Sequence, residues 1–285
     1  MSYDMLKSAV QLSSQSVNLG YSILGEGSST ILCLHGLTRN SSDFFYLAKS
    51  LSIDHKVISI DMPGRGQSDY LQDPHKYNYN TYYRCVIDFL NSLHVRNVKI
   101  VGTSMGGIIA MYVAAYSPDI VSAIVLNDIG PYIALDPLRK LSTYVSRYPA
   151  FANKKAAEDY LRMFLSPLAL KKEEHWSHMI DNSIKLANDG NYYLNYDPKI
   201  GKIFEQSINS MDEGMNLWHV WQKIKQPILV LRGQKSTILT EDTVNRMKEG
   251  RDNVDSIEYQ GVGHVPSLME NEQIDHVKEW LNTRS

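Results

Sequence analysis

The chain has 285 residues, and its 29 Lys and Arg against 31 Asp and Glu give a formal charge of -2 at pH 7. Hydrophobic residues make up 43% and charged residues 21% of the sequence, which excludes the polar, highly charged composition of a disordered protein. Because the basic residues are scattered and form no stripe, the composition favours neither nucleic acid nor an anionic membrane as a partner.

The sequence also lacks the usual signs of export or membrane insertion. Its longest apolar run, residues 108–115, is well short of the roughly 20 residues that span a bilayer. The first eleven residues carry Asp4 and Lys7 and lack the apolar stretch of a secretory signal. Cys33 and Cys85 lie in a predicted strand and a predicted helix, which favours buried, reduced thiols. We therefore expect a folded, cytoplasmic protein.

The first half of the chain alternates strand and helix patterns at a regular pace. Short β-rich runs such as TILCLH (30–35) and KVISI (56–60) predict strands, and the apolar positions of residues 80–93 recur at helical spacing. Strands separated by helices imply a mostly parallel sheet with helices on both faces. The predicted strands are 16–24, 30–35, 56–60, 97–101 and 121–126, and the predicted helices are 42–50, 80–93 and 105–116.

After Asp128 this rhythm stops and later resumes. Residues 131–215 contain helical stretches at 138–147, 156–165 and 173–186 but no convincing strand, which predicts an inserted helical cap. The alternation returns with strands at 227–232 and 255–260 and helices at 241–248 and 271–281. We therefore expect three segments: a first part of the core (1–130), the cap (131–215) and a second part of the core (216–285).

The sequence Gly102-Thr103-Ser104-Met105-Gly106 matches G-x-S-x-G at a predicted strand–helix junction. Glycines on both sides of the turn remove side chains that would clash in it, so the Ser104 hydroxyl can project above the sheet. With Gly at about 7% of residues, the pattern alone arises by chance in roughly one chain in ten of this length. Its position between a strand and a helix makes Ser104 a candidate nucleophile, the alternative being a structural turn serine.

Two other strand ends carry candidate catalytic groups. After His35-Gly36, a backbone N–H can join the N–H that follows the nucleophile in binding an oxyanion, which assigns Leu37 and Met105 as donors. The alternative for His35-Gly36 is a plain turn. Near the C-terminus, His264 follows Gly261-Val262-Gly263 on a loop between the last predicted strand and helix, where a general base is expected.

The whole chain resembles a cap-bearing α/β-hydrolase, and six motifs carry the resemblance in order. It implies an α/β fold with a mostly parallel eight-stranded-type sheet, helices on both faces and the inserted cap. It also implies Ser104 as nucleophile, His264 as base, Leu37 and Met105 as oxyanion donors, and no cofactor or metal. The motifs are LHGLTRNSSDF (34–44), DMPGRGQSD (61–69), GTSMGG (102–107), LNDIGP (126–131), LRG (231–233) and GVGHVP (261–266).

One position departs from the family pattern. Relatives carry the triad aspartate shortly after the strand that corresponds to 227–232, where this chain has Thr237. A threonine cannot carry the negative charge that stabilises an imidazolium. The candidate replacements are Asp128, at the end of an earlier strand, and Glu241 or Asp242, a few residues after Thr237. Asp128 could instead organise its loop by a hydrogen bond. Glu241 and Asp242 follow Thr240 in a predicted first helical turn, where acids favour the helix dipole.

These features predict a serine hydrolase acting on a small ester, thioester or related acyl compound, with Ser104, His264 and Asp128 as the catalytic residues. The cap aromatics Tyr144, Tyr148, Phe164, Trp176, Tyr192 and Tyr193 are expected to roof an apolar acyl pocket or to form the core of the cap. Two alternatives stay open: a carbon–carbon bond hydrolase of the same fold, and a non-catalytic ligand-binding protein that lost the acid. The oligomeric state stays open as well.

Overall fold

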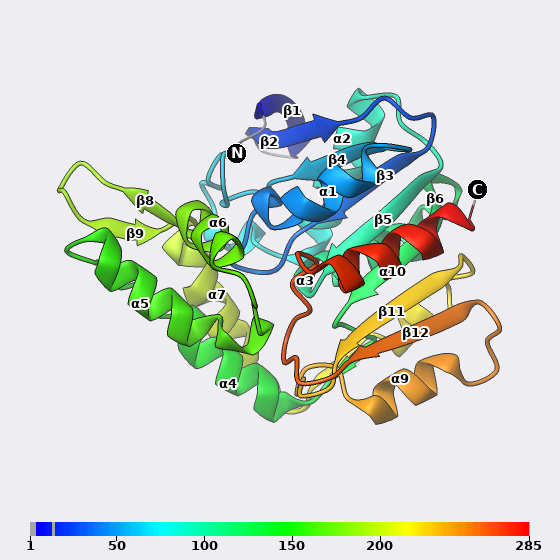
Figure 1. Cartoon of the computed structure of the whole chain (residues 1–285). Helices are drawn as coiled ribbons and strands as arrows, with labels where there is room; N and C mark the ends of the chain where they lie inside the picture. Colours follow the sequence, from blue (N-terminus) through cyan, green and yellow to red (C-terminus); the bar gives the residue numbers. More distant parts are fainter. Residues whose placement is uncertain (1–3, 13–14, 285) are drawn as a thin grey trace.

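A computed structural model of the chain describes residues 4–12 and 15–284, and it is built around one eight-stranded sheet (Figure 1). The strand order is β1-β2-β4-β3-β5-β6-β11-β12, in which β1 and β2 are antiparallel to their neighbours and the other strands are parallel. This sheet confirms the fold class expected from the sequence. The strands are β1 (Leu6–Leu12), β2 (Gln15–Leu24), β3 (Thr30–Leu34), β4 (Lys56–Ile60), β5 (Val98–Thr103), β6 (Val121–Asn127), β11 (Ile228–Gly233) and β12 (Val254–Tyr259).

Helices cover both faces of the sheet because successive strand residues point to opposite sides. In β3, Ile31 and Cys33 join the apolar layer under α1 and α10, whereas Leu32 and Leu34 join the layer under α2 and α3. Both layers exclude water almost completely, so the sheet is buried on both faces. The core helices are α1 (Phe45–Leu51), α2 (Tyr79–Ser92), α3 (Met105–Tyr116), α8 (Trp218–Trp221), α9 (Glu241–Lys248) and α10 (Asn271–Asn282).

The segment between β6 and α8 forms a mostly helical layer beside the core (Figure 1). Its ends meet, because β7 (Tyr132–Ile133) pairs with β10 (Met215–Asn216). The expectation of no strand in this segment was wrong: the predicted helix at 173–186 ends at Ser183, and the next three residues form one arm of a hairpin. The remaining elements are α4 (Leu135–Val145), α5 (Lys154–Phe164), α6 (Glu173–Ser183), β8 (Ile184–Leu186), β9 (Tyr192–Leu194) and α7 (Pro198–Asn209).

The turn between β5 and α3 requires its glycines. A Cβ at Gly102 would lie 2.5 Å from the Gly106 carbonyl oxygen, and a Cβ at Gly106 would lie 1.9 Å from the Leu34 carbonyl oxygen. Ser104 itself has a φ of 51° and a ψ of -115°, a conformation that costs a side-chain-bearing residue about 1–3 kcal/mol. The close approach of α3 to β3 and β5 therefore holds Ser104 in a strained position at the carboxyl edge of the sheet.

No helix within residues 4–12 and 15–284 is both long enough and apolar enough to cross a membrane.

We expect Gly106→Ala to lower the free energy of unfolding by about 2–3 kcal/mol or more, because the new methyl group would collide with backbone that cannot move independently. Urea unfolding followed by circular dichroism measures this difference. Gly36→Ala is the matched control, since its Cβ would meet nothing closer than 3.5 Å. Equal stabilities of the two variants would contradict the packing argument.

Candidate active site

Ser104, His264 and Asp128 form a continuous chain of hydrogen bonds at the carboxyl edge of the sheet. His264 Nε2 lies 3.0 Å from Ser104 Oγ, and His264 Nδ1 lies 2.6 Å from Asp128 Oδ2. Asp128 is fully buried, whereas a fifth of the His264 side chain is exposed. A carboxylate on Nδ1 holds the imidazole with its Nε2 lone pair toward the hydroxyl, which is the arrangement of a nucleophile and its general base.

Two strands hold the Asp128 carboxylate in place. Asp128 directly follows β6, and its N–H donates to Leu231 O of the neighbouring β11. Its Oδ1 accepts the N–H of Gly233 at 2.9 Å, which leaves Oδ2 for His264. The parallel pairing of β6 with β11 therefore places the acid beside the strand that Thr237 follows.

The other positions considered for the triad acid lie away from this chain of hydrogen bonds. The side chain of Thr237 is exposed in the loop after β11. Glu241 and Asp242 are exposed in the first turn of α9, behind the N-cap Thr240, whose side chain accepts the N–H of Thr243. The structure thus brings Asp128 to His264 and gives the other two acids the helix-terminal place expected of them.

The N–H groups of Leu37 and Met105 flank Ser104 from two elements. Leu37 lies in the turn after β3, and Met105 is the first residue of α3. A Cβ at the adjacent Gly36 would lie 3.9 Å from Ser104 Cβ, so this turn passes directly beside the serine. Within the described residues neither N–H has a hydrogen-bond acceptor. Both N–H groups are thus free to bind an oxyanion, which is the role proposed for them from the sequence.

His35 fixes the peptide that contains the Leu37 N–H. Its Nδ1–H donates to Gly36 O at 2.7 Å, and its Nε2 accepts the N–H of Met62 at 2.9 Å. Burial, with the nearby positive charge of Arg65, lowers the pKa of His35 to about 3. The imidazole is therefore neutral near pH 7, and its Nδ1–H constrains the peptide plane whose other side presents the Leu37 N–H.

Arg65 lies behind the same turn with no solvent exposure. Its Nε donates to Leu37 O at 2.8 Å, and Nη1 donates to Pro63 O and Tyr82 Oη. Its guanidinium carbon lies 5.0 Å from the centre of the Tyr82 ring. No carboxylate among the described residues is within ion-pair distance of it. Arg65 lies in the DMPGRGQSD motif (61–69) but was not among the site residues predicted from the sequence.

A small cavity lies between the turn after β3 and the cap. Its volume is about 20 Å³, enough for about one water molecule. Of the six cap aromatics predicted from the sequence, Tyr144 and Phe164 line it, whereas Tyr148, Trp176, Tyr192 and Tyr193 do not. Two aromatics that were missed, Tyr160 and Tyr196, complete the lining. The other lining residues are Thr38, Arg39, Val145, Leu161, Leu165, Ser183 and Leu194.

A larger surface hollow of about 570 Å³ lies elsewhere and is bordered by Trp218, Trp221 and Arg246. Lining residues 221, 222 and 225 precede β11, and residues 250–253 precede β12. The hollow therefore lies toward the amino ends of strands whose carboxyl ends face the Ser104 site. It is not part of this site. Within the described chain, no group of three or more His, Cys, Asp and Glu side chains is arranged to hold a metal ion.

Comparisons with known proteins agree with this architecture. The alpha/beta hydrolase fold family matches residues 29–270. The 3-hydroxybutyrate-oligomer hydrolase of Cupriavidus necator is 31% identical over 249 residues, which cover 86% of this chain and 85% of that protein. A crystal structure of a candidate hydrolase from Rickettsia typhi is 36% identical, has a TM-score of 0.91 and covers all of both chains.

An alpha/beta hydrolase from Novosphingobium aromaticivorans is 30% identical, with a TM-score of 0.88 and 99% of each chain covered. The family match spans most of the sequence and includes Ser104 and His264, while these likenesses extend over the cap as well as the core. The chain therefore belongs to the alpha/beta hydrolase family.

Proposed function

We propose that the chain is a serine hydrolase that cleaves a small carboxylic ester, thioester or related acyl compound through an acyl-enzyme on Ser104. The observation that carries the proposal is the continuous contact from Asp128 through His264 to Ser104 Oγ. A protein that only bound its ligand would have no use for a fully buried carboxylate that orients a partly exposed imidazole. We expect such an enzyme to act in the cytoplasm, as the sequence suggests.

The proposed reaction has two stages. Ser104 Oγ attacks the acyl carbon while His264 Nε2 takes its proton, and the Leu37 and Met105 N–H groups hold the negative oxygen of the tetrahedral intermediate. His264 then gives the proton to the leaving group, whose departure leaves the acyl group on Ser104. A water molecule, deprotonated by His264, releases the acid and restores the hydroxyl. Asp128 keeps the imidazolium oriented and stabilised at both stages.

The name of the Cupriavidus necator relative, 3-hydroxybutyrate-oligomer hydrolase, suggests the first class of substrate to test. Oligomers of 3-hydroxybutyrate are esters of a hydroxy acid, which fits an acyl-transfer site. A carbon–carbon bond hydrolase would use the same serine and histidine. These residues therefore do not distinguish ester hydrolysis from carbon–carbon bond hydrolysis, and assays with different substrates are needed. Assays on p-nitrophenyl esters of increasing chain length, on 3-hydroxybutyrate oligomers and on a diketone distinguish them.

We expect Ser104→Ala to lower the kcat of ester hydrolysis by at least about 10⁴-fold, since no other group in the site could accept the acyl chain. A fluorophosphonate should form one covalent adduct on the wild-type protein and none on the variant. Mass spectrometry of the labelled peptide measures the adduct, and the thermal unfolding midpoint checks that the fold is kept. Equal labelling of both proteins would refute the assignment of the nucleophile.

We expect Asp128→Asn to lower kcat by about 10⁴-fold, which corresponds to about 5.5 kcal/mol in the barrier. An asparagine can still accept the Gly233 N–H, so the variant tests the charge and leaves that anchor in place. Thr237→Asp is the matched control and should change kcat less than about threefold, because position 237 is exposed. A nearly silent Asp128→Asn together with a more active Thr237→Asp would show that the acid belongs at 237.

We expect His35→Phe to lower kcat by about 10–100-fold with less than a threefold change in KM. Loss of the Nδ1–H releases the Gly36 peptide and loosens the Leu37 donor, an effect smaller than the 10²–10³-fold cost of removing an oxyanion donor outright. His55→Phe is the matched control, because His55 is also buried but bonds to Asn282. An equal fall in kcat for both variants would mean that His35 acts only through stability.

A further inference from the structure

The cavity beside the turn after β3 contains one charged side chain, that of Arg39. The other residues of its lining are apolar or carry hydroxyl groups, among them Thr38, Ser183 and Tyr196. Asp43 pairs with one edge of this guanidinium, and the low polarity of the walls strengthens the attraction between its remaining N–H donors and an acceptor. The lining therefore has the chemistry of a site for an apolar chain that ends in a negative charge.

The stem of Arg39 lies beside the nucleophile. The Cβ position at Gly36 is 3.5 Å from Arg39 Cγ and 3.9 Å from Ser104 Cβ, so both side chains lie near Gly36. The absence of a side chain at Gly36 keeps this space open. An acyl group held at Ser104 can thus extend past Gly36 toward the guanidinium.

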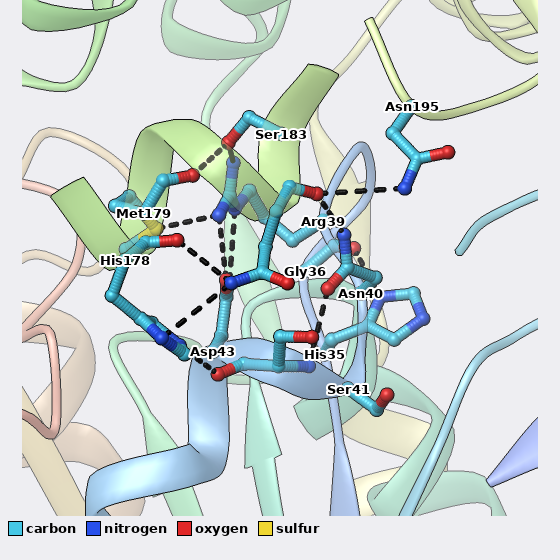
Figure 2. Close-up of polar contacts among 12 residues, drawn as sticks. His35, Gly36, Arg39, Asn40, Ser41, Asp43, His178, Met179, Ser183 and Asn195 are labelled. Atoms are coloured by element: carbon cyan, nitrogen blue, oxygen red, sulfur yellow. Dashed lines mark hydrogen bonds and ion pairs between the residues drawn. The ribbon is translucent and has the colours of Figure 1, made fainter. Parts of the chain in front are cut away.

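One edge of the Arg39 guanidinium pairs with Asp43, and the other edge faces the cap. Nε and Nη2 form a fork with the two oxygens of Asp43, at 2.9 Å and 2.6 Å. Nη1 donates to Ser183 Oγ of α6, and Nη2 also contacts Met179 Sδ on that helix (Figure 2). Asp43 fixes the plane of the guanidinium, and the donors that face the cap bind groups that belong to a separate layer.

Three contacts of the cap lie around this edge. Asn40 Nδ2 donates to Asn182 O, His178 Nε2 donates to Ser42 O, and Arg39 reaches Ser183 (Figure 2). A cavity of about 20 Å³ cannot admit an acyl chain while these contacts are closed. An acyl chain that enters along this edge requires Ser183 Oγ to leave Arg39 Nη1, because the two are in contact.

We propose that Arg39 binds a carboxylate on the acyl part of the substrate, in the place that Ser183 Oγ occupies in this structure. The proposal rests on the proposed function, and it narrows the substrate to acyl compounds with a free carboxylate a short carbon chain away from the scissile carbonyl. A carboxylate suits the donors at this edge, since a planar guanidinium offers parallel N–H groups that match the two oxygens. Asp43 keeps the guanidinium oriented while the partner at the other edge is exchanged.

The test compares two esters that differ only at the end of the acyl chain: the mono-p-nitrophenyl ester of glutaric acid and p-nitrophenyl valerate. We expect Arg39→Met to lower the ratio of kcat/KM for the glutarate ester to that for the valerate ester by about 10–100-fold, the size of one charge-assisted interaction. The change should appear mainly in the KM of the glutarate ester. Arg39→Lys should keep part of the ratio, because it retains the charge but not the fork.

His178→Ala is the matched control, because it removes a neighbouring contact between the cap and the core and leaves Arg39 intact. Its ratio should stay within about twofold of the wild-type ratio. Free glutarate gives a second measurement: it should inhibit valerate hydrolysis competitively in the wild-type protein and at least about tenfold more weakly in Arg39→Met.

An equal loss of kcat/KM for both esters in Arg39→Met, or an equal fall of the ratio in His178→Ala, would overturn the proposal. Arg39 would then only hold the cap against the core. Such a result would leave the proposed hydrolase function standing if the wild-type protein still cleaves p-nitrophenyl valerate. A wild-type protein that cleaves neither ester and takes up no fluorophosphonate would overturn both proposals.

Discussion

The geometry of the site depends on the anchoring of one buried carboxylate. Asp128 has no solvent exposure, and it satisfies its two oxygens with the Gly233 N–H and His264 Nδ1. Gly233 is itself fixed, because a Cβ there would lie 2.1 Å from Gly263 O in the loop that carries His264. The end of β6, the end of β11 and the histidine loop are therefore packed around the same carboxylate. A shift in any of them would move His264 relative to Ser104.

This anchoring explains how an acid on β6 can take the place of one in the loop after β11. The two strands are neighbours and parallel, so their carboxyl ends reach the same edge about 4.8 Å apart. An imidazole on a separate loop needs only a small change of orientation to meet a carboxylate from either strand. With the acid on β6, the loop after β11 no longer needs a charged residue, and Thr237 can point into solvent. Under the proposed function, the departure from the family pattern at position 237 corresponds to a relocation of the acid from the loop after β11 to the end of β6.

The sequence predicted those features of the structure that depend on residues close together in the chain. Hydrophobic periodicity predicted the parallel strands and the buried helix α3, and the spacing of glycines predicted the turn at Ser104. The pairing of Asp128 with His264 could be stated as a hypothesis because both follow strands whose order the resemblance implied. Strand β1 and the hairpin of β8 and β9 were missed, since these edge and cap strands depend on partners that are not encoded in their own short segments.

The contacts that surround the turn after β3 (residues 37–39) could not be predicted for a different reason. Arg65 is 28 positions from Leu37 along the chain, and Ser183 is 144 positions from Arg39. The contacts that Ser183 and Tyr196 make around this turn also require the cap to be docked on the core. From the sequence alone, arginines and hydroxyl-bearing residues are expected to lie on the surface. The four cap aromatics that do not line the cavity show the same limit: Tyr148, for example, stacks on Tyr193 at 5.8 Å.

Two arginines beside this turn differ in the groups that balance their charge. Arg65 is enclosed by backbone carbonyls and tyrosines, and its charge helps to lower the pKa of His35 next to the Leu37 peptide. A field that opposes a proton on His35 also favours negative charge on an oxygen bound at the Leu37 N–H. Arg39 is neutralised by Asp43 and also contacts Ser183 of the cap. In the proposed reaction, the enclosed charge of Arg65 suits a transition state that forms next to the Leu37 peptide, whereas the paired charge of Arg39 suits the substrate carboxylate that we propose it binds.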